Sequence, residues 1–211
     1  RLLLLIRFNW AVVGFAICYI AVSWAIRFQP GIYVMALVDV ILLANLVYIH
    51  RTGNYAVAAN IYLFANCFIG ILGCTYFSGG LFSPVIWWFA TGPVTAILLL
   101  GFNRNAILWL LMNVLLVLGF GVAAWLHVDL PFAYDAQHAD FFFATSLIGL
   151  VLTLLIHTKI FDTAKNRALI ESEARNAQLQ AALHATALAR QKAEEATASK
   201  SAFLANMSHE I

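Results

Sequence analysis

Charged residues are scarce in this sequence, and their scarcity excludes most soluble folds. Only 10% of the 211 residues are charged and 63% are hydrophobic, which gives a mean hydropathy of +0.86. Soluble domains are close to half apolar and about a quarter charged. The composition therefore predicts a membrane protein with several spans. A net charge of only +2 gives no reason to expect a nucleic-acid partner.

Patterns of several other protein classes are missing too. Cys18, Cys67 and Cys74 lie in apolar runs without a CxxC pair or a Cys/His cluster, so we expect packing residues and no disulfide or metal site. No signal-peptide pattern opens the chain, and no glycine-rich phosphate loop occurs in it. Because the chain begins without Met, we expect it to be a piece of a longer protein.

Long apolar runs are what the sequence has in abundance. A helix needs about 20 apolar residues to cross about 30 Å of hydrocarbon. Polar turns with proline or glycine separate the runs, and Ser83 before Pro84 predicts a helix N-cap. Six stretches qualify or nearly qualify, the fourth being short: 8–26, 32–48, 55–76, 84–100, 106–126 and 141–160.

Lys and Arg predict the orientation of these spans. With six spans both ends of the chain lie on one side, and the acidic loop 127–140 and Arg27 lie on the other. The first side would hold Arg1, Arg7, Arg51, Arg104, Lys159, Lys165 and Arg167. The positive-inside rule therefore predicts that both termini are cytoplasmic.

Polar residues within the predicted spans need partners. Asp39 lies in the middle of the second span, where a carboxylate is costly unless it faces the bundle interior or water. It could belong to a signal site, or its neutral acid could form a packing hydrogen bond, and both interpretations stay open. We expect interhelical hydrogen bonds from Asn9, Asn45, Asn60, Asn66 and Asn113.

Aromatic residues gather at the predicted outer ends of the third and fourth spans. They are Tyr76, Phe77, Phe82, Trp87 and Trp88. An aromatic interface belt is the favoured interpretation. The alternative is a pocket opened by a kink at Pro93, in which Tyr76, Trp87 and Trp88, together with Asp39, are candidate ligand-binding residues.

The remaining histidines carry weaker signals. His127 and His138 flank the acidic loop, but their spacing does not support a cation site. His157 and His184 fall toward the cytoplasmic side, where we expect solvated side chains.

Residues 161–201 contain neither proline nor glycine and are rich in Ala, Glu, Gln, Arg and Lys. These residues favour a helix that continues the sixth span. A heptad frame places Leu169, Leu183 and Leu204 on one seam, whose middle is polar. The pattern predicts a weak coiled coil that needs a partner helix, and a solvated single helix is the alternative.

The last residues, Phe203 to Ile211, read FLANMSHEI. On a helix, Leu204, Met207 and Ile211 form an apolar stripe, and His209 lies roughly opposite, beside Glu210. An exposed imidazole is nucleophilic near neutral pH, and an adjacent carboxylate can accept or orient its proton. By pattern alone an ordinary surface histidine is favoured.

The segment from Ala193 to Ile211 resembles the phospho-acceptor box of sensor histidine kinases, and the match is nearly unbroken over FLANMSHEI. The resemblance implies that His209 is phosphorylated and that Glu210 is its acid/base, on the first helix of a dimeric hairpin. The Arg-Thr-Pro that usually follows, the second hairpin helix and the ATP-binding domain are not in these residues. We therefore expect ATP and Mg²⁺ to be bound by a catalytic domain outside this fragment, which alone would be inactive.

The membrane part carries a second, less specific resemblance. SGGLFSPVIWW, Ser78 to Trp88, together with Pro93, is similar to a segment of multi-span sensor regions in bacterial histidine kinases. The resemblance implies an architecture and names no ligand.

Together these patterns predict an all-α protein. Residues 1–160 would form a six-span transmembrane sensor domain in a bacterial inner membrane, 161–201 a cytoplasmic signalling helix or coiled coil, and 202–211 the start of a phosphotransfer hairpin. The protein would be a homodimer that converts an unknown small-molecule signal into phosphorylation of His209 and of an aspartate on a response regulator or fused receiver domain. A transporter-like domain with a kinase tail is the alternative, and a purely structural membrane anchor is the third possibility.

The predicted orientation can be tested by cysteine labelling. A cysteine in place of Ala136 should react with a membrane-impermeant maleimide added from outside, because the acidic loop faces that side. Cysteines in place of Thr52 or Gln178 should not react. Reversed labelling, or labelling of all three positions from outside, would contradict six spans with a cytoplasmic C-terminus.

Overall fold

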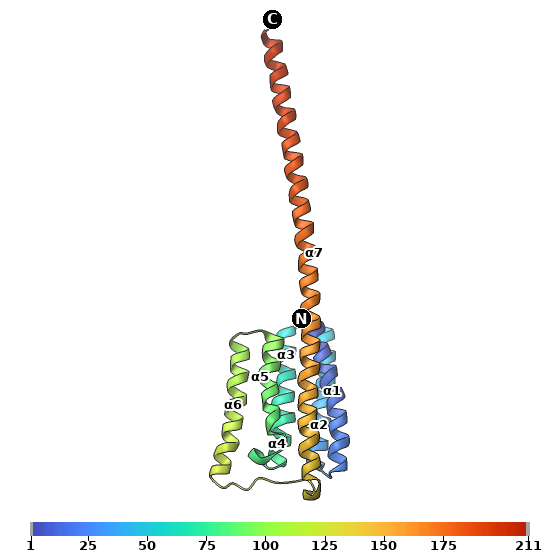
Figure 1. The fold of residues 1–211 in the computed structure, drawn as a ribbon, viewed down its shortest axis with the longest axis vertical. Helices are drawn as coiled ribbons and strands as arrows, with labels where there is room; N and C mark the ends of the chain where they lie inside the picture. The colour runs from blue at the N-terminus through green and yellow to red at the C-terminus, as the bar shows by residue number, and fades with distance from the viewer. Residues whose placement is uncertain (1, 210–211) are drawn as a thin grey trace. The chain divides into compact units, whose positions relative to one another are not determined.

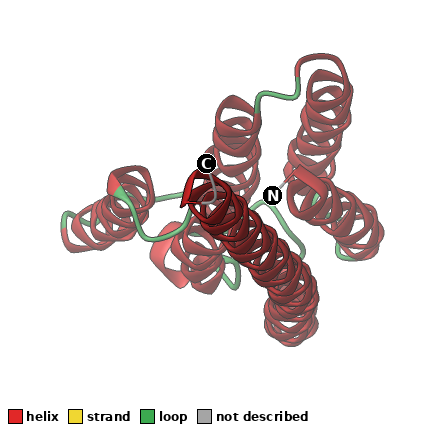
Figure 2. Cartoon of the chain, turned by 90° about the horizontal axis from the view of Figure 1, so that it is seen from above, coloured by secondary structure: helices red, strands yellow, loops and turns green. Residues whose placement is uncertain are grey.

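The computed structural model describes the backbone of residues 2–209 and the side chains of residues 2–195. The described part is helical, with one isolated β-bridge and no strand, so the all-α prediction is confirmed. The chain divides into two compact units, Arg1–Asp162 and Thr163–Ile211. In the first unit the helices run alongside one another (Figure 1), and from above they are seen end-on, joined by short loops (Figure 2).

Within the described residues, five helices are long and apolar enough to cross a membrane. Helices α1 (Leu2–Ala25) and α2 (Gln29–Thr52) come first. The third is a continuous rod built from α3 (Tyr55–Phe64), the π-helix η1 (Ala65–Ile71) and α4 (Leu72–Phe77). The last two are α6 (Arg104–Trp125) and the first part of α7 (Ala139–His209).

The predicted fourth span is the short one. After the 3-10 turn η2 (Gly80–Phe82), the chain forms the 3-10 helix η3 (Ile86–Ala90) and then α5 (Thr91–Leu100). At 1.5 Å per residue, α5 alone covers only about 15 Å, half of the hydrocarbon thickness. Pro93 lies in the first turn of α5, where a missing N–H costs no helical hydrogen bond, so the helix interior has no kink there. Six full crossings therefore stay a prediction.

Local signals in the sequence set several helix ends. Gly53 ends α2 with φ +62°, a left-handed conformation that glycine adopts without strain, and its N–H donates to the Ile49 carbonyl. Asn54 caps α3 by accepting from the N–H of Val57, and Asn103 caps α6 by accepting from the N–H of Ala106. Each side chain satisfies a backbone donor that the helix leaves free.

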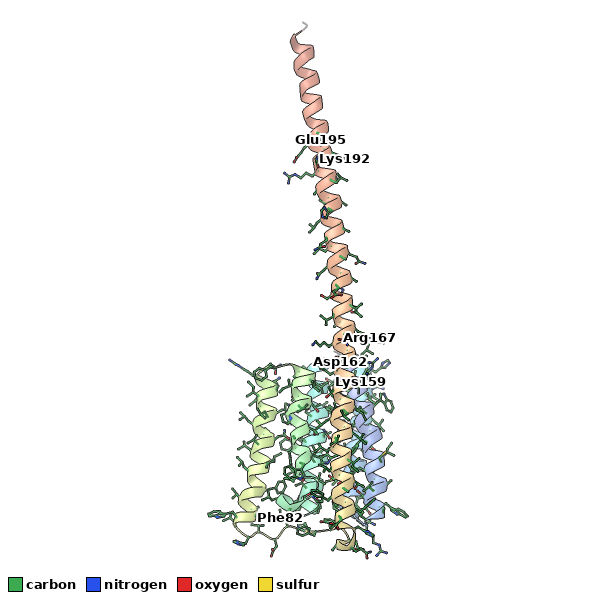
Figure 3. The ribbon with its side chains drawn as sticks, viewed as in Figure 1. Phe82, Lys159, Asp162, Arg167, Lys192 and Glu195 are labelled. Carbon is green, nitrogen blue, oxygen red and sulfur yellow. The ribbon has the colours of Figure 1, made fainter. Side chains whose placement is uncertain are left out.

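The first unit has two chemically different ends. We name the end with the turn 53–54, Arg104 and Lys159 the basic end, and the end with residues 26–28, 78–85 and 126–138 the acidic end. Phe82 lies at the acidic end and Lys159 at the opposite one (Figure 3). The acidic end includes the last 3-10 turn, η4 (Ala136–His138).

Aromatic rings hold α7 against α1 and the loops near the acidic end. Phe142 of α7 is fully buried, with its ring centroid 5.6 Å from Phe28, 6.1 Å from Tyr19 and 5.1 Å from Tyr134. Burial in this loop also raises the pKa of the Tyr134 phenol, so the group stays protonated at neutral pH. Lipid is as apolar as these rings, so moving them from lipid into the protein gains little by removal from water. Close packing of the rings is what stabilises the cluster.

A buried polar contact joins three helices near the basic end. The Asn45 amide donates to Asn9 Oδ1 at 3.2 Å and to the Ala58 carbonyl at 3.0 Å, while Asn9 donates to the Leu5 carbonyl. Trp109 of α6 donates to Asn60 Oδ1 at 3.0 Å. The predicted interhelical role is confirmed for Asn9, Asn45 and Asn60. The described bond of Asn113 is to a carbonyl of its own helix.

The second unit is the remainder of α7. Its described side chains from Lys165 onward are exposed, including the heptad leucines Leu169 and Leu183. Arg190 Nε lies 2.8 Å from Glu194, and Gln191 donates to Glu195, so contacts at i,i+4 spacing support the helix locally. The leucines are exposed in the single chain, which fits both a coiled coil and a solvated single helix, so both interpretations stay predictions.

Candidate functional site

The segment between α4 and η3 folds back on itself at the acidic end. Gly79 has φ +102° and Gly80 has φ +62°, and a Cβ on either would overlap the loop side chains Phe132 and Leu130. The Ala133 N–H donates to the Phe77 carbonyl at 2.9 Å. Glycine is therefore required at both positions, by the backbone conformation and by the loop that covers it.

Two buried serines satisfy the polar groups of this turn. Ser78 donates to the Cys74 carbonyl, and the hydroxyls of Ser78 and Ser83 are hydrogen-bonded to each other. Ser83 Oγ also accepts from the N–H of Val85 at 3.0 Å. The predicted helix cap at Ser83 is wrong, because the 3-10 helix η3 begins at Ile86 after its N-cap Val85, and the Ser83 hydroxyl stabilises the turn before that helix.

Trp88 and Ser146 connect this segment to α7. The Trp88 indole N–H lies 3.0 Å from Ser146 Oγ and 3.2 Å from the Ser146 carbonyl, and Ser146 Oγ donates to the Pro84 carbonyl at 2.8 Å. The Trp88 ring packs on Phe15 of α1 with centroids 4.6 Å apart. A Cβ on Gly149 would lie 2.9 Å from Phe15 and 3.2 Å from Trp88, so glycine permits the close approach. We call Phe15, Pro84, Trp88, Ser146 and Gly149 the Trp88 junction.

The predicted aromatic group divides into two environments. Trp88 is only 7% exposed and is a core residue, so the belt interpretation is wrong for it. Tyr76 and Trp87 are 45% and 59% exposed, as a belt requires. Trp87 lines a separate cavity of about 430 Å³ beside α6, together with Pro93 and Asn113. Sequence alone could not separate the two adjacent tryptophans, because the 3-10 geometry of η3 decides which one faces the core.

Asp39 lies on α2. Its side chain is half-buried, and among the described residues Oδ1 has no hydrogen-bond partner. Trp87 and Trp88 line different cavities, and neither cavity is lined by Asp39 or Tyr76. Their ligand-binding role stays a prediction.

His157 is the residue that the sequence interpretation missed. It was expected to be solvated but is 1% exposed, stacked on Phe8 with ring centroids 4.4 Å apart. Its Nε2 lies 3.4 Å from the Tyr62 hydroxyl, and Nδ1 is buried without a partner among the described side chains. The available signal was its position within the predicted span 141–160. His184 is exposed as expected.

The predicted catalytic residues lie at the end of α7. His209 is the last residue of α7, and the structure describes its backbone but not its side chain. Glu210 lies outside the described residues. Within the described part no group of three or more His, Cys, Asp or Glu residues could hold a metal ion, the acidic loop included.

The Trp88 junction generates a stability prediction. Ser146→Ala leaves the Pro84 carbonyl buried without its donor, which should lower the free energy of unfolding by about 1 kcal/mol. Thr158→Ala is the matched control, because the Thr158 hydroxyl is exposed and bonds only to the Leu154 carbonyl of its own helix. Reversible denaturation in detergent micelles measures both. Equal stability of the two variants would contradict a structural role for Ser146.

Substitution by leucine should change the apparent Tm in opposite directions at Asp39 and at Asn45. Asp39→Leu removes a polar group without a described partner and should raise the apparent Tm, whereas Asn45→Leu breaks two interhelical bonds and should lower it. Asp39→Asn separates the effects on function, because it keeps the shape but cannot ionise. Loss of signalling in both Asp39 variants, with stability kept, would indicate a signal site. Full signalling in both would contradict one.

Comparison with known proteins gives one distant relative. The chain is 27% identical over 212 residues to the hybrid signal transduction histidine kinase K of Dictyostelium discoideum, and the alignment covers 99% of this chain but 16% of that protein. No protein-family model and no solved structure matches the chain. The chain thus spans about a sixth of the length of this signal transduction kinase, and its apolar helices are long enough for a membrane protein.

Proposed function

We propose that this chain is the membrane sensor region of a two-component histidine kinase, ending in the phospho-acceptor helix. The observation that carries the proposal is the continuity of α7. One helix, Ala139–His209, contains Ser146 of the Trp88 junction and the backbone of Phe203 to His209, the first seven residues of FLANMSHEI. The similarity to a hybrid histidine kinase over nearly the whole chain supports it independently.

The signal would enter through packing in the first unit. Ser146 and Gly149 hold α7 against η3 and α1 by contacts that depend on rotation of α7, because the Ser146 hydroxyl must face Trp88 and Pro84. A stimulus that changes this packing would shift or rotate α7. Two packings a few kcal/mol apart can be exchanged by a ligand with a differential affinity of that order.

The linker would respond to such a shift because its seam is marginal. Leucines at Leu169 and Leu183 favour association with a second copy, whereas Thr186 and Arg190 on the same seam weaken it. More than one packing of a homodimeric coiled coil would then lie close in energy. Access of His209 to ATP would differ between these packings.

The chemistry would follow the histidine kinase pattern. A ring nitrogen of His209 would attack the γ-phosphorus of ATP, the bond to the β–γ bridging oxygen would break, and ADP would leave. Glu210 would accept the ring proton. ATP and Mg²⁺ would be held by a catalytic domain outside these residues, and the phosphoryl group would pass to an aspartate of a response regulator or a fused receiver domain. The location would be a plasma membrane, with both termini cytoplasmic; the resemblance implies a bacterial inner membrane.

The test is phosphorylation of the full-length kinase. His209→Gln should abolish acid-labile phosphate while membrane insertion is unchanged, because the amide cannot act as the nucleophile. His184→Gln is the matched control, since His184 is an exposed histidine on the same helix, and it should keep the phosphate signal. Acid-labile phosphate that persists in His209→Gln would refute the assignment.

A further inference from the structure

An open groove runs along the first unit between α1 and α7. Its volume is about 520 Å³, and its lining extends from Trp10 to Val22 on α1 and from Thr145 to His157 on α7. At 1.5 Å per residue each stretch covers about 18 Å of helix. The groove is thus long and narrow and lies between two helices that are apolar enough to cross a membrane.

The shape of the groove depends on glycine. Gly14 on α1 is exposed in it, and a Cβ built there meets no atom within 4 Å. Gly149 on α7 lies opposite against Phe15. Glycine destabilises a helix relative to alanine, so helix stability does not explain why glycine is at position 14. Its missing side chain leaves room in the groove.

The chemistry of the lining is apolar and uncharged. None of the side chains that line the groove, all of them described, is Asp, Glu, Lys or Arg. A charged occupant would lose its hydration without gaining a counter-ion. A neutral occupant suits this lining.

Two buried hydrogen-bonding atoms of the lining have no partner among the described residues. They are the Tyr19 hydroxyl and His157 Nδ1, on side chains that are 5% and 1% exposed. Nε2 of His157 lies 3.4 Å from the Tyr62 hydroxyl, and the histidine tautomer decides which of the two donates. In the neutral tautomer whose Nε2 accepts from Tyr62, Nδ1 carries the proton and is a donor. The Tyr19 hydroxyl can donate in either tautomer, so an acceptor oxygen can satisfy Tyr19 and, in that tautomer, His157 as well.

We propose that this groove binds a neutral, membrane-soluble molecule with a single aliphatic chain and a carbonyl or hydroxyl oxygen that accepts from His157 Nδ1 or the Tyr19 hydroxyl. The groove length fits one extended chain, the uncharged lining fits a neutral molecule, and the two orphan donors fit an acceptor oxygen. Gly149 lies both at the groove and at the Trp88 junction, so an occupant would contact the element that positions α7. That the occupant is a signal rests on the proposed function, whereas its binding does not.

The test uses photolabelling of the full-length protein in phosphatidylcholine vesicles without ATP. The probe is a long-chain methyl ketone with a diazirine on its terminal carbon, and the comparison probe is the alkane of the same length without the oxygen. Peptide mapping should place the ketone label on α1 and α7 in the groove. One hydrogen bond of about 1 kcal/mol predicts about fivefold stronger labelling by the ketone than by the alkane.

Two variants separate shape from hydrogen bonding. Gly14→Leu fills the groove from an exposed position and should reduce labelling by both probes about tenfold or more. Gly119→Leu on α6 is the matched control, because a Cβ there also meets nothing within 4 Å, and labelling should be unchanged. His157→Phe keeps a ring stacked on Phe8 but lacks Nδ1, and Tyr19→Phe keeps the ring but lacks the hydroxyl. In the double variant both donors are absent, so ketone labelling should fall to the alkane level. Circular dichroism and size-exclusion chromatography check that each variant is folded.

Three results would overturn the proposal. Full labelling in Gly14→Leu would show that the probes bind elsewhere. Equal labelling of the parent by both probes would mean that the groove holds an ordinary lipid chain. Dimers cross-linked through Cys18, the cysteine of the three that is exposed and lines the groove, with no probe labelling, would mean that a second copy fills it. None of these results bears on His209, so failure here is distinguishable from failure of the kinase assignment.

Discussion

The polar groups buried among these helices have no water to bind in a bilayer, so each requires a partner within the protein. The constraint is most severe between α4 and η3, where the backbone is not helical. Ser78 and Ser83 bond to each other and to nearby backbone groups, and Ser146 reaches from α7 to the Pro84 carbonyl. The serine of α7 is therefore part of a turn that belongs to a different region of the chain. The position of α7 and the conformation of this turn depend on each other, which a fully apolar contact would not ensure.

Sequence reasoning succeeded where the determining signal is local. Gly53 ends α2 and Asn54 caps α3 through groups within a few residues, so this turn could be predicted. The cap predicted at Ser83 was wrong, because tertiary contacts place a turn between Ser83 and the start of η3. Sequence reasoning also failed where burial depends on neighbours far along the chain. Trp88 and His157 lie in runs that are apolar on all sides, and such helices have no polar face that reveals their orientation. Only the assembled bundle shows that both side chains face inward.

Some buried polar atoms on α2 and α7 have no described partner. The Asn45 amide donates to Asn9 and to the Ala58 carbonyl, but Asn45 Oδ1, like Asp39 Oδ1 and His157 Nδ1, has no partner among the described residues. An unsatisfied polar group in a membrane helix is costly, so its presence needs a reason other than stability. In the described part of the linker, by contrast, the leucines Leu169 and Leu183 and the polar residues beside them are all exposed.

The π-helical segment Ala65–Ile71 has a geometric consequence for the third rod. Ala58 and Cys74 are 16 positions apart, and an unbroken α-helix would turn them about 160° away from each other. Both are nevertheless fully buried, and both carbonyls accept bonds from buried side chains, Asn45 and Ser78 respectively. The wider π turn rotates less per residue and so brings the two faces back toward one side. The π-helix thus changes the rotational position of α4 relative to α3. Deleting one residue within it would rotate the turn that contains Ser78 and Ser83 away from its contacts with α7.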